Sequence, residues 1–408
     1  MNSAKKVAIL TNNIICEVIC RYYSTLEKYF ILNGWEVTTD FNCDLVIFPA
    51  CGVMDEMHRA VNIALEQLEQ INFPKNNIII TGCQPKTHEA ELAATFKGKI
   101  IEYGKEYMLD EIINAHIPFA HIKPTNVFKA FVGIQNKGRS ELFNIQISDG
   151  CLQCCTFCVI NKAHGYIRSF AMEDILEQYR SAVEHGYKKI YLFGMDTFAY
   201  GYDTGKTNII ELIERMLDIS SNENIFLGPL HIKWLREYSD GVLSLCKRGI
   251  VNSLHIGLQH VNDQILKRMG RPMKFAELYE DIKRIKSECP NIFLSADLLA
   301  GFPGETDEIY QELMSFVKTD TFFDMLQLHV YDDVKAAPAY KLDGKVSPAK
   351  KKVREYELNV AIGERGPYPT IKKRAEISDN NEYFRYSNGY QNRVYEGYYF
   401  CKNTYNEL

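Results

Sequence analysis

The sequence predicts an α/β protein with an N-terminal parallel sheet followed by a parallel β/α barrel, complete or partial. Three observations predict this class. Short apolar runs alternate with helical patterns over most of the 408 residues. Several runs are apolar almost without interruption, as strands covered on both faces are. Cysteines follow several of these runs. A length of 408 residues favours more than one domain, and 46% hydrophobic with 24% charged residues is a globular composition.

The first predicted domain, residues 1–125, alternates strands and helices and indicates a small parallel sheet of the flavodoxin or Rossmann type. Strands are expected at residues 7–11, 44–50, 77–82 and 99–103, and helices at 22–32 and 54–70. Gly34 and Gly82 fall where elements turn. A polar, less regular stretch follows, so residues 126–141 are expected to link this domain to the next.

The second predicted domain, residues 142–365, repeats the alternation and favours the barrel. Strands are expected at residues 143–147, 189–193, 254–258, 292–299 and 325–331, and helices at 172–184, 275–287 and 307–317. A helical pattern at 348–362 comes last. Residues 366–408 form a short tyrosine-rich segment, in which Asn388-Gly389 is a plausible hairpin turn.

Charge and hydropathy exclude some classes of function. The formal charge of -5 and pI near 6.1 weigh against a protein that binds nucleic acid by bulk charge. No run is long and apolar enough to span a membrane, and the N-terminus has no signal-peptide pattern, so a cytoplasmic location is expected. In such a protein the 12 cysteines are better interpreted as metal ligands, reactive thiols or core residues than as a disulfide framework.

Cys151, Cys155 and Cys158 form a C-x3-C-x2-C pattern directly after a predicted strand. Three thiolates for a cluster that normally takes four leave one iron free to bind something else. A zinc site would also use Cys154, but adjacent cysteines cannot easily face one tetrahedral ion. A ferredoxin pattern would place a Cys-Pro after the run, and none is there. Core packing is less expected still, and Cys154 is interpreted as a bystander.

Three further cysteines follow strands of the first domain. Cys51 comes after the predicted strand 44–50, Cys83 after 77–82, and Cys16 a few residues after 7–11. The carboxyl ends of parallel strands share one edge, where open α/β sheets bind ligands. Each cysteine alone would more often be a buried core residue. Together they suggest a second three-thiolate cluster.

The stretch Ile147-Ser148-Asp149-Gly150-Cys151, continued to Phe157-Cys158, resembles the cluster loop of radical S-adenosylmethionine (SAM) enzymes. The resemblance implies that the open iron binds the amino and carboxylate groups of SAM, which is reductively cleaved to a 5'-deoxyadenosyl radical. It also implies that Phe157 lies near the adenine.

Motifs in the first predicted domain indicate which group of radical SAM enzymes the chain resembles. Pro49-Ala50-Cys51-Gly52 and Thr81-Gly82-Cys83 are similar to stretches of the methylthiotransferases, whose N-terminal domain holds an auxiliary four-iron cluster. The implied ligands are Cys16, Cys51 and Cys83, with Cys20 as a possible substitute for Cys16. The implied cofactors are therefore SAM and two 4Fe-4S clusters.

Motifs in the barrel stand in the order of the same family: 194–201, 258–260 with 265–271, and 301–306. The resemblance implies cofactor contacts, and the candidates are Gly194, Asp196, Thr197, Gln259, His260 and Asp297. Structural alternatives stay open. Thr306 can simply cap a helix, His260 can be a buried structural residue, and Asp297 can satisfy backbone groups.

The motifs look most like the branch that modifies an aspartate of a ribosomal protein. This implies an enzyme that replaces an unactivated C-H bond by C-S-CH3, at an aspartate β-carbon or a comparable side-chain carbon of a protein or ribosomally made peptide. Two alternatives are tRNA adenosine methylthiolation and, in another class, an iron-sulfur protein for electron transfer or redox sensing.

The expected partners follow from that chemistry. They are the protein or peptide substrate, an electron donor such as a flavodoxin, and a sulfur source, while nucleic acid is less expected. These enzymes normally end in a small β-barrel (TRAM-like) domain. About forty residues follow Gly363, so the chain is expected to lack that domain.

Overall fold

The computed structural model describes residues 4–12, 16–53, 55–126, 142–364 and 399–400. The chain divides into two compact units. The first comprises Met1–Asn144, Val159–Gly165 and Arg393–Leu408, and the second Ile145–Cys158 and Tyr166–Asn392. The hairpin predicted at Asn388-Gly389 and nearly all of the linker 126–141 lie outside the described residues. Within the described part of the chain, no helix could cross a membrane.

The first unit is built on a mainly parallel sheet. Strands β1 (Lys6–Thr11), β3 (Leu45–Ala50), β4 (Ile78–Gly82) and β5 (Lys99–Ile100) are successive parallel neighbours. Strand β2 (Glu36–Thr38) pairs parallel with the start of β1, and β15 (Tyr399–Phe400) pairs antiparallel with its end. Every residue of β3 and β4 is buried, which confirms strands covered on both faces. The predicted strand 99–103 is shorter than expected.

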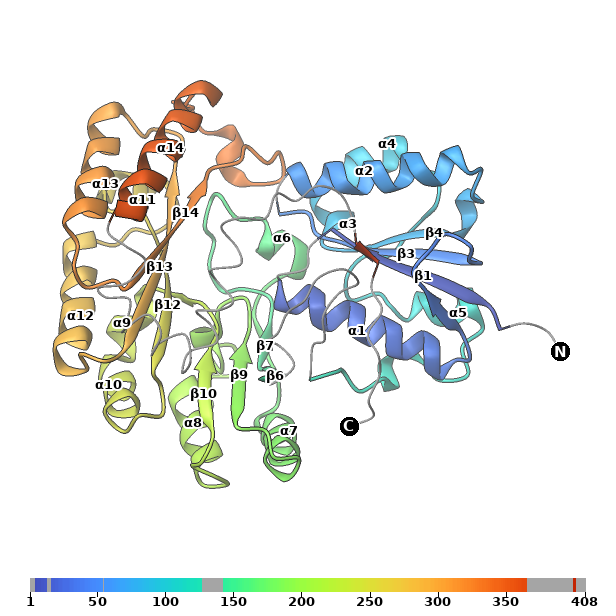
Figure 1. Ribbon diagram of the computed structural model, residues 1–408, viewed down its shortest axis with the longest axis horizontal. Coiled ribbons are helices and arrows are strands. Elements are labelled where there is room, and N and C mark those ends of the chain that lie inside the picture. Colours follow the sequence, from blue (N-terminus) through green and yellow to red (C-terminus); the bar gives the residue numbers. More distant parts are fainter. Residues whose placement is uncertain (1–3, 13–15, 54, 127–141, 365–398, 401–408) are drawn as a thin grey trace. The chain divides into compact units, whose positions relative to one another are not determined.

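Helices cover both faces of this sheet. Figure 1 shows α2 (Asp55–Gln70) and α4 (Glu89–Thr95) on one side, and α1 (Glu17–Leu32) and α5 (Met108–Ile113) on the other. The short helix α3 (Gln84–Thr87) follows β4. The prediction that α1 begins at residue 22 was wrong. Cys16 is its N-cap and accepts a hydrogen bond from the N-H of Cys20 at 2.9 Å. Val18 and Ile19 are already buried, so the buried face starts one turn earlier.

The second unit carries two sheets whose strands follow one another in chain order. Strands β6 (Leu142–Gln146), β9 (Lys189–Phe193) and β10 (Asn224–Leu227) form the first. Strands β11 (Leu230–His231), β12 (Ser253–Gln259), β13 (Phe293–Ala300) and β14 (Met325–Val330) form the second, and each adjacent pair in it is parallel. The fold is thus an open version of the predicted barrel. Strands β10 and β11 were missed because both are short.

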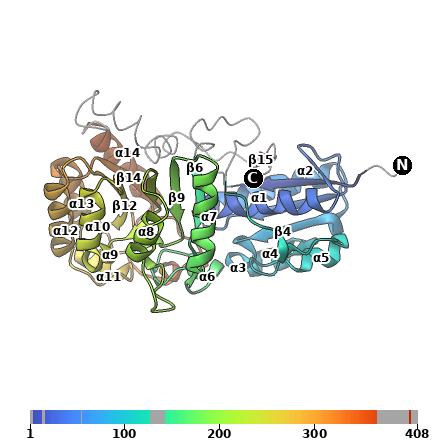
Figure 2. The same cartoon turned by 90° about the horizontal axis from the view of Figure 1, so that it is seen from below.

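Helices between these strands, and one after the last of them, cover the sheets. Those between the strands are α7 (Met172–Glu184), α8 (Ile209–Leu217), α9 (Lys233–Glu237), α10 (Ser239–Lys247), α11 (Asp263–Arg268), α12 (Phe275–Glu288) and α13 (Asp307–Thr319), and α14 (Pro348–Glu364) follows β14. Figure 2 shows α7 and α8 beside β6 and β9. Side chains of Asn208, Asn262 and Thr306 cap α8, α11 and α13. Strands β7 (Ser148–Asp149) and β8 (Arg168–Ser169) pair antiparallel beside the cysteine loop.

Candidate metal centres

The loop after β7 gathers three thiols. Cys155 is buried, Cys151 and Cys158 are half-buried, and Cys154 is exposed. Burial first, and then the charges of Asp196, Cys158 and Cys155, raise the pKa of the Cys151 thiol to about 12, while the N-H of Gln153 acts to lower it. The Cys155 and Cys158 thiols are thus near enough to Cys151 for their charges to act on it.

This donor set suits an iron-sulfur cluster. Three crowded, partly buried thiols repel each other's negative charge, and bound iron would reverse that penalty. Two buried hydroxyls next to the loop, Ser148 Oγ and Thr197 Oγ1, have no hydrogen-bond partner among the described residues. Buried polar atoms normally have partners, so these two are suited to a ligand or water. No three His, Cys, Asp or Glu side chains in the described ranges are arranged to chelate a single metal ion.

Asp196 and Gly194 lie against the cysteine loop. The buried Asp196 carboxylate accepts hydrogen bonds from Gln153 Nε2 at 3.0 Å and from Trp234 Nε1 at 2.8 and 3.0 Å. Burial raises the pKa of Asp196, while these donors lower it. A Cβ on Gly194 would lie 2.4 Å from Ser148 Oγ, so a larger residue there would require the serine side chain to move. Asp196 therefore holds the loop through Gln153, and the contact of Asp196 and Gly194 with a cofactor stays a prediction.

Gln259 is the last residue of strand β12, and His260 follows it. Gln259 has a positive φ of 73°, where the pairing of β12 with β13 shifts register. Such a strained residue usually redirects a side chain. A Cβ on Gly257 would lie 3.6 Å from Gln259 Nε2, so the amide of Gln259 turns back along the strand. Contact of Gln259 with a cofactor stays a prediction.

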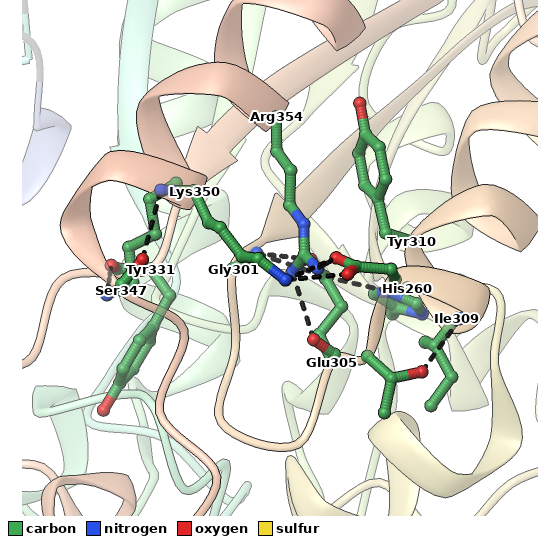
Figure 3. A network of polar contacts seen from close by, with 12 residues as sticks. His260, Gly301, Glu305, Ile309, Tyr310, Tyr331, Ser347, Lys350 and Arg354 are labelled. Atoms are coloured by element: carbon green, nitrogen blue, oxygen red, sulfur yellow. Dashed lines mark hydrogen bonds and ion pairs between the residues drawn. The ribbon is translucent and has the colours of Figure 1, made fainter.

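His260 is completely buried, and both of its ring nitrogens have partners. Nδ1 accepts the N-H of Asn262 at 3.0 Å, so Nε2 carries the proton and donates to Glu305 at 3.2 Å. Glu305 also accepts the N-H of Gly301 and is paired with Arg354 Nη1 at 2.6 Å (Figure 3). These contacts give His260 a structural role at the turn after β13. A contact with SAM would require one of them to break.

Asp297 lies between two histidines. His255 Nε2 donates to one carboxylate oxygen at 3.0 Å, and His329 Nε2 donates to the other at 3.1 Å. Burial works against the ionised carboxylate, but the histidines outweigh it and hold the pKa of Asp297 well below its usual range. Asp297 is predicted from the sequence, whereas its two histidine partners are not.

The sheet edge of the first unit holds the other three predicted ligands. Ala50 and Gly82 pair in register, so Cys51 and Cys83 follow them at the same level, and the N-H of Cys83 donates to Ala50 O at 2.9 Å. Both cysteines are buried. Burial raises the pKa of the Cys16 thiol, and the largest charge acting on it is that of Cys51. The edge therefore brings Cys16 close to Cys51, while the alternative ligand Cys20 is buried within α1.

Comparison with known proteins assigns both units. Residues 145–317 match the model of the radical SAM superfamily, and residues 16–101 match that of the uncharacterized protein family UPF0004. The chain is similar to the ribosomal protein uS12 methylthiotransferase RimO of Acidovorax sp. (strain JS42), with 30% identity over 76% of this chain and 71% of the relative. The chain belongs to the radical SAM methylthiotransferase family.

Other similarities agree with this family. RimO of Fervidobacterium nodosum is 29% identical over 79% of this chain and 75% of the relative. Among solved structures, the radical SAM methyltransferase TsrM from Kitasatospora setae, with cobalamin and a [4Fe-4S] cluster bound, aligns with a TM-score of 0.53. Its identity is 14%, over 80% of this chain and 75% of that chain, so this likeness concerns the fold alone. The cofactors of the methylthiotransferase are SAM and two 4Fe-4S clusters.

Arg271 of the methylthiotransferase lies at the end of the motif 265–271, and no role was predicted for it. Its buried guanidinium donates from Nε to Cys155 Sγ at 3.4 Å and from Nη1 to Gly257 O, and it lies 5.5 Å from the Phe157 ring centroid. Phe157 packs on an apolar cluster that includes Leu299. Arg271 therefore ties the cysteine loop to β12 and supplies a positive charge beside a thiol.

Asn12 and His164 were missed in the first unit of the methylthiotransferase. The side-chain amide of Asn12 forms two hydrogen bonds with the backbone of Cys51. It accepts the N-H of Cys51 at 2.8 Å and donates to the carbonyl of Cys51 at 3.0 Å. His164 Nε2 lies 3.2 Å from Cys83 Sγ, and its ring is 4.3 Å from that of Tyr103, measured between centroids. His164 ends helix α6 (Ile160–His164), which begins two residues after Cys158. No spacing pattern in the sequence connects either residue to a cysteine.

Proposed function

We propose that this enzyme inserts a methylthio group at the β-carbon of an aspartate, or at a comparable side-chain carbon, in a protein or ribosomally made peptide. Ribosomal protein uS12 is the first candidate substrate, because the similar RimO proteins are named for it. The observations that support the proposal are the C-x3-C-x2-C loop of the second unit and, in the first unit, Cys51 and Cys83 directly after the paired ends of β3 and β4. The loop alone would suit an ordinary radical SAM enzyme.

The proposal assigns Cys151, Cys155 and Cys158 to the cluster that binds SAM. The second cluster is assigned to Cys16, Cys51 and Cys83, with Cys20 as the substitute for Cys16. Phe157, which immediately precedes Cys158, is proposed to lie near the adenine, as the resemblance of the loop to those of radical SAM enzymes implies. Contacts of Gly194, Asp196, Thr197, Gln259 and Asp297 with SAM are also proposed.

The reaction balances with two molecules of SAM. One would supply the methyl group. The other would be reductively cleaved to methionine and the 5'-deoxyadenosyl radical, which takes the substrate hydrogen atom and becomes 5'-deoxyadenosine. The inserted sulfur comes from a sulfide source, and the electrons come from a donor protein such as a flavodoxin. The protein must hold the reacting carbon, exclude water and bring the two centres together, so positioning does most of its work.

Iron content tests the ligand assignment. After anaerobic reconstitution we expect roughly eight irons per chain, and about four after Cys51→Ala, Cys83→Ala or Cys151→Ala. Only Cys151→Ala should also abolish 5'-deoxyadenosine formation from SAM. The controls are Cys154→Ala, exposed in the same loop, and Cys43→Ala, half-buried in the first unit. About four irons in the unchanged protein, unaffected by Cys51→Ala, would remove the second cluster.

Mass spectrometry tests the substrate. Protein uS12 isolated from cells with and without the gene should differ by one SCH2 unit located on an aspartate. A gain on another protein or peptide would keep the reaction and replace the substrate. A methylthio group on tRNA adenosine, with no modified protein, would instead select the tRNA alternative.

A further inference from the structure

One face of the sheet β11–β14 is polar along three adjacent strands. Residues alternate in a strand, so those of one parity share a face. The apolar parity, including Leu254, Ile256, Leu294 and Leu298, is buried. Figure 1 shows α12 and α13 along one side of this sheet. The other parity carries the residues Ser253, His255, Ser295, Asp297, Gln327 and His329. A closed barrel fills its interior with branched apolar side chains, so this polar face is suited to binding rather than to packing.

Three of these residues form a row across the strands. His255 on β12, Asp297 on β13 and His329 on β14 are joined by hydrogen bonds of 3.0 and 3.1 Å to the two oxygens of Asp297. His255 is anchored further by Ser295, whose Oγ lies 2.9 Å from Nδ1. The row is therefore fixed at its His255 end.

Exposure increases along the row. The side chains of His255, Asp297 and His329 are 5%, 19% and 48% exposed. His329 Nε2 is bound to Asp297, and no other hydrogen bond of its ring occurs among the described residues. The accessible end of the row is therefore an imidazole whose Nδ1 is available to a ligand.

The row lies at the end of the sheet that the cysteine loop covers. His329 pairs in register with Leu299, and Leu299 packs in the apolar cluster against which Phe157 of the loop lies. Arg271 contacts β12 at Gly257, two residues beyond His255, and also contacts Cys155 and Phe157. A group bound at His329 would thus be held on the face beneath the loop that cleaves SAM.

The charge of Asp297 favours a protonated imidazole at His329, the accessible end of the row. A carboxylate only accepts, so Nε2 of His329 must carry a proton, and the charge of His329 depends on Nδ1. Burial works against the imidazolium, but the hydrogen bond and charge of Asp297 outweigh it and raise the pKa of His329. An imidazolium held by a carboxylate presents a second N-H, and its natural partner is an anionic oxygen.

We propose that His329, oriented by Asp297, donates this hydrogen bond to the carboxylate of the substrate side chain that is to be modified. The inference rests on the proposed function and makes His329 a specificity-determining residue for an acidic side chain. The reacting β-carbon of an aspartate is bonded directly to the carboxyl carbon. A hydrogen bond that fixes the carboxylate therefore also positions the C-H bond.

The test pairs a change in the enzyme with the matching change in the substrate. Reconstituted full-length enzyme is assayed with a uS12 peptide that carries the target aspartate, and with the same peptide carrying asparagine. The variants are His329→Gln, which removes the charge, and His329→Lys, which keeps a cation. His185→Gln, an exposed histidine at the end of α7, is the control.

We expect His329→Gln to raise the KM for the aspartate peptide about tenfold to a hundredfold, the usual value of a hydrogen bond to a charged group. The KM for the asparagine peptide should change far less, so selectivity collapses. His329→Lys should recover part of the selectivity, and the control variant should retain all of it. Iron content should equal that of the unchanged protein.

Three results would overturn the inference while the proposed function stands. They are unchanged selectivity in His329→Gln, an equal loss with both peptides, and a rise in the KM for SAM instead of the peptide. If the unchanged enzyme modifies neither the peptide nor uS12 itself, nor any other protein or peptide of the cell, the proposed function fails and this inference fails with it.

Discussion

Replacing Arg354 by methionine should strongly destabilise the second unit. The guanidinium is 4% exposed and pairs with Glu305, whose side chain is fully buried. Glu305 also accepts hydrogen bonds from His260 and from the N-H of Gly301 (Figure 3). Arg354→Met leaves that carboxylate buried without its charged partner. Breaking a buried pair in this way costs about 3–5 kcal/mol.

The loss can be measured as a melting temperature. For a unit of this size each kcal/mol lowers the melting temperature by about 2–4 °C, so we expect a decrease of about 6–20 °C. The chain has two tryptophans, Trp35 in the first unit and Trp234, fully buried, in the second. In a Trp35→Phe background the fluorescence therefore reports on the second unit alone, which avoids treating two units as one transition.

A matched control separates buried from exposed pairing. Arg284 forms ion pairs with Asp240 and Glu288 at the surface, and exposed pairs contribute little. Arg284→Met should melt close to the unchanged protein. The double variant Glu305→Gln/Arg354→Met should recover part of the loss, because it removes the unpaired charge. If Arg354→Met melts like Arg284→Met, or if the double variant is no better than the single one, the buried charge does not govern stability here.

Two further variants test the cysteine edge and the histidine row. Gly82→Ala should lower iron content towards four per chain, because φ is +84° and the new Cβ would lie 2.8 Å from Ala50 O, whereas Gly104→Ala has a φ of +89° with open space around it and should keep its iron. Burial opposes and Asp297 favours the cation of His329, and the net effect raises its pKa above 6.5. Its stabilisation is therefore complete below pH 6.5 and is lost as the pH rises through the raised value. The difference in melting temperature between the protein and His329→Gln should shrink with rising pH, and a constant difference would argue against this pairing.

Strand positions were predictable where apolar runs were long. β3, β4, β9 and β13 lie within a residue or two of the expected ranges. Of these, β3 and β4 are buried throughout, and strands buried on both faces are almost purely apolar. β10 and β11 were not found, because strands of four and two residues carry too little pattern. The start of α1 was misplaced, because Cys16 caps it without any of the usual N-cap side chains.

Some residues of the candidate site could likewise be recognised from the sequence, and others could not. The cysteines were recognisable because their spacing and their position after strands carry the chemistry. His255 and His329 were not, since each stands alone in its strand, and its partner Asp297 lies 42 or 32 residues away. A weak signal did exist. Ser295 with Asp297, and Gln327 with His329, are polar residues at alternate positions of otherwise apolar strands.

Helix α6 means that the two units cannot be made as independent fragments. The chain runs from Cys158 of the second unit directly into Val159–Gly165, which belongs to the first. A polypeptide cut within residues 126–141 would separate the amino-terminal half from the helix that carries His164, and so from the neighbour of Cys83. Splitting the gene at the apparent linker should therefore yield an incomplete amino-terminal fragment. The first unit needs a segment that lies within the second half of the chain, so both halves must be made as one polypeptide.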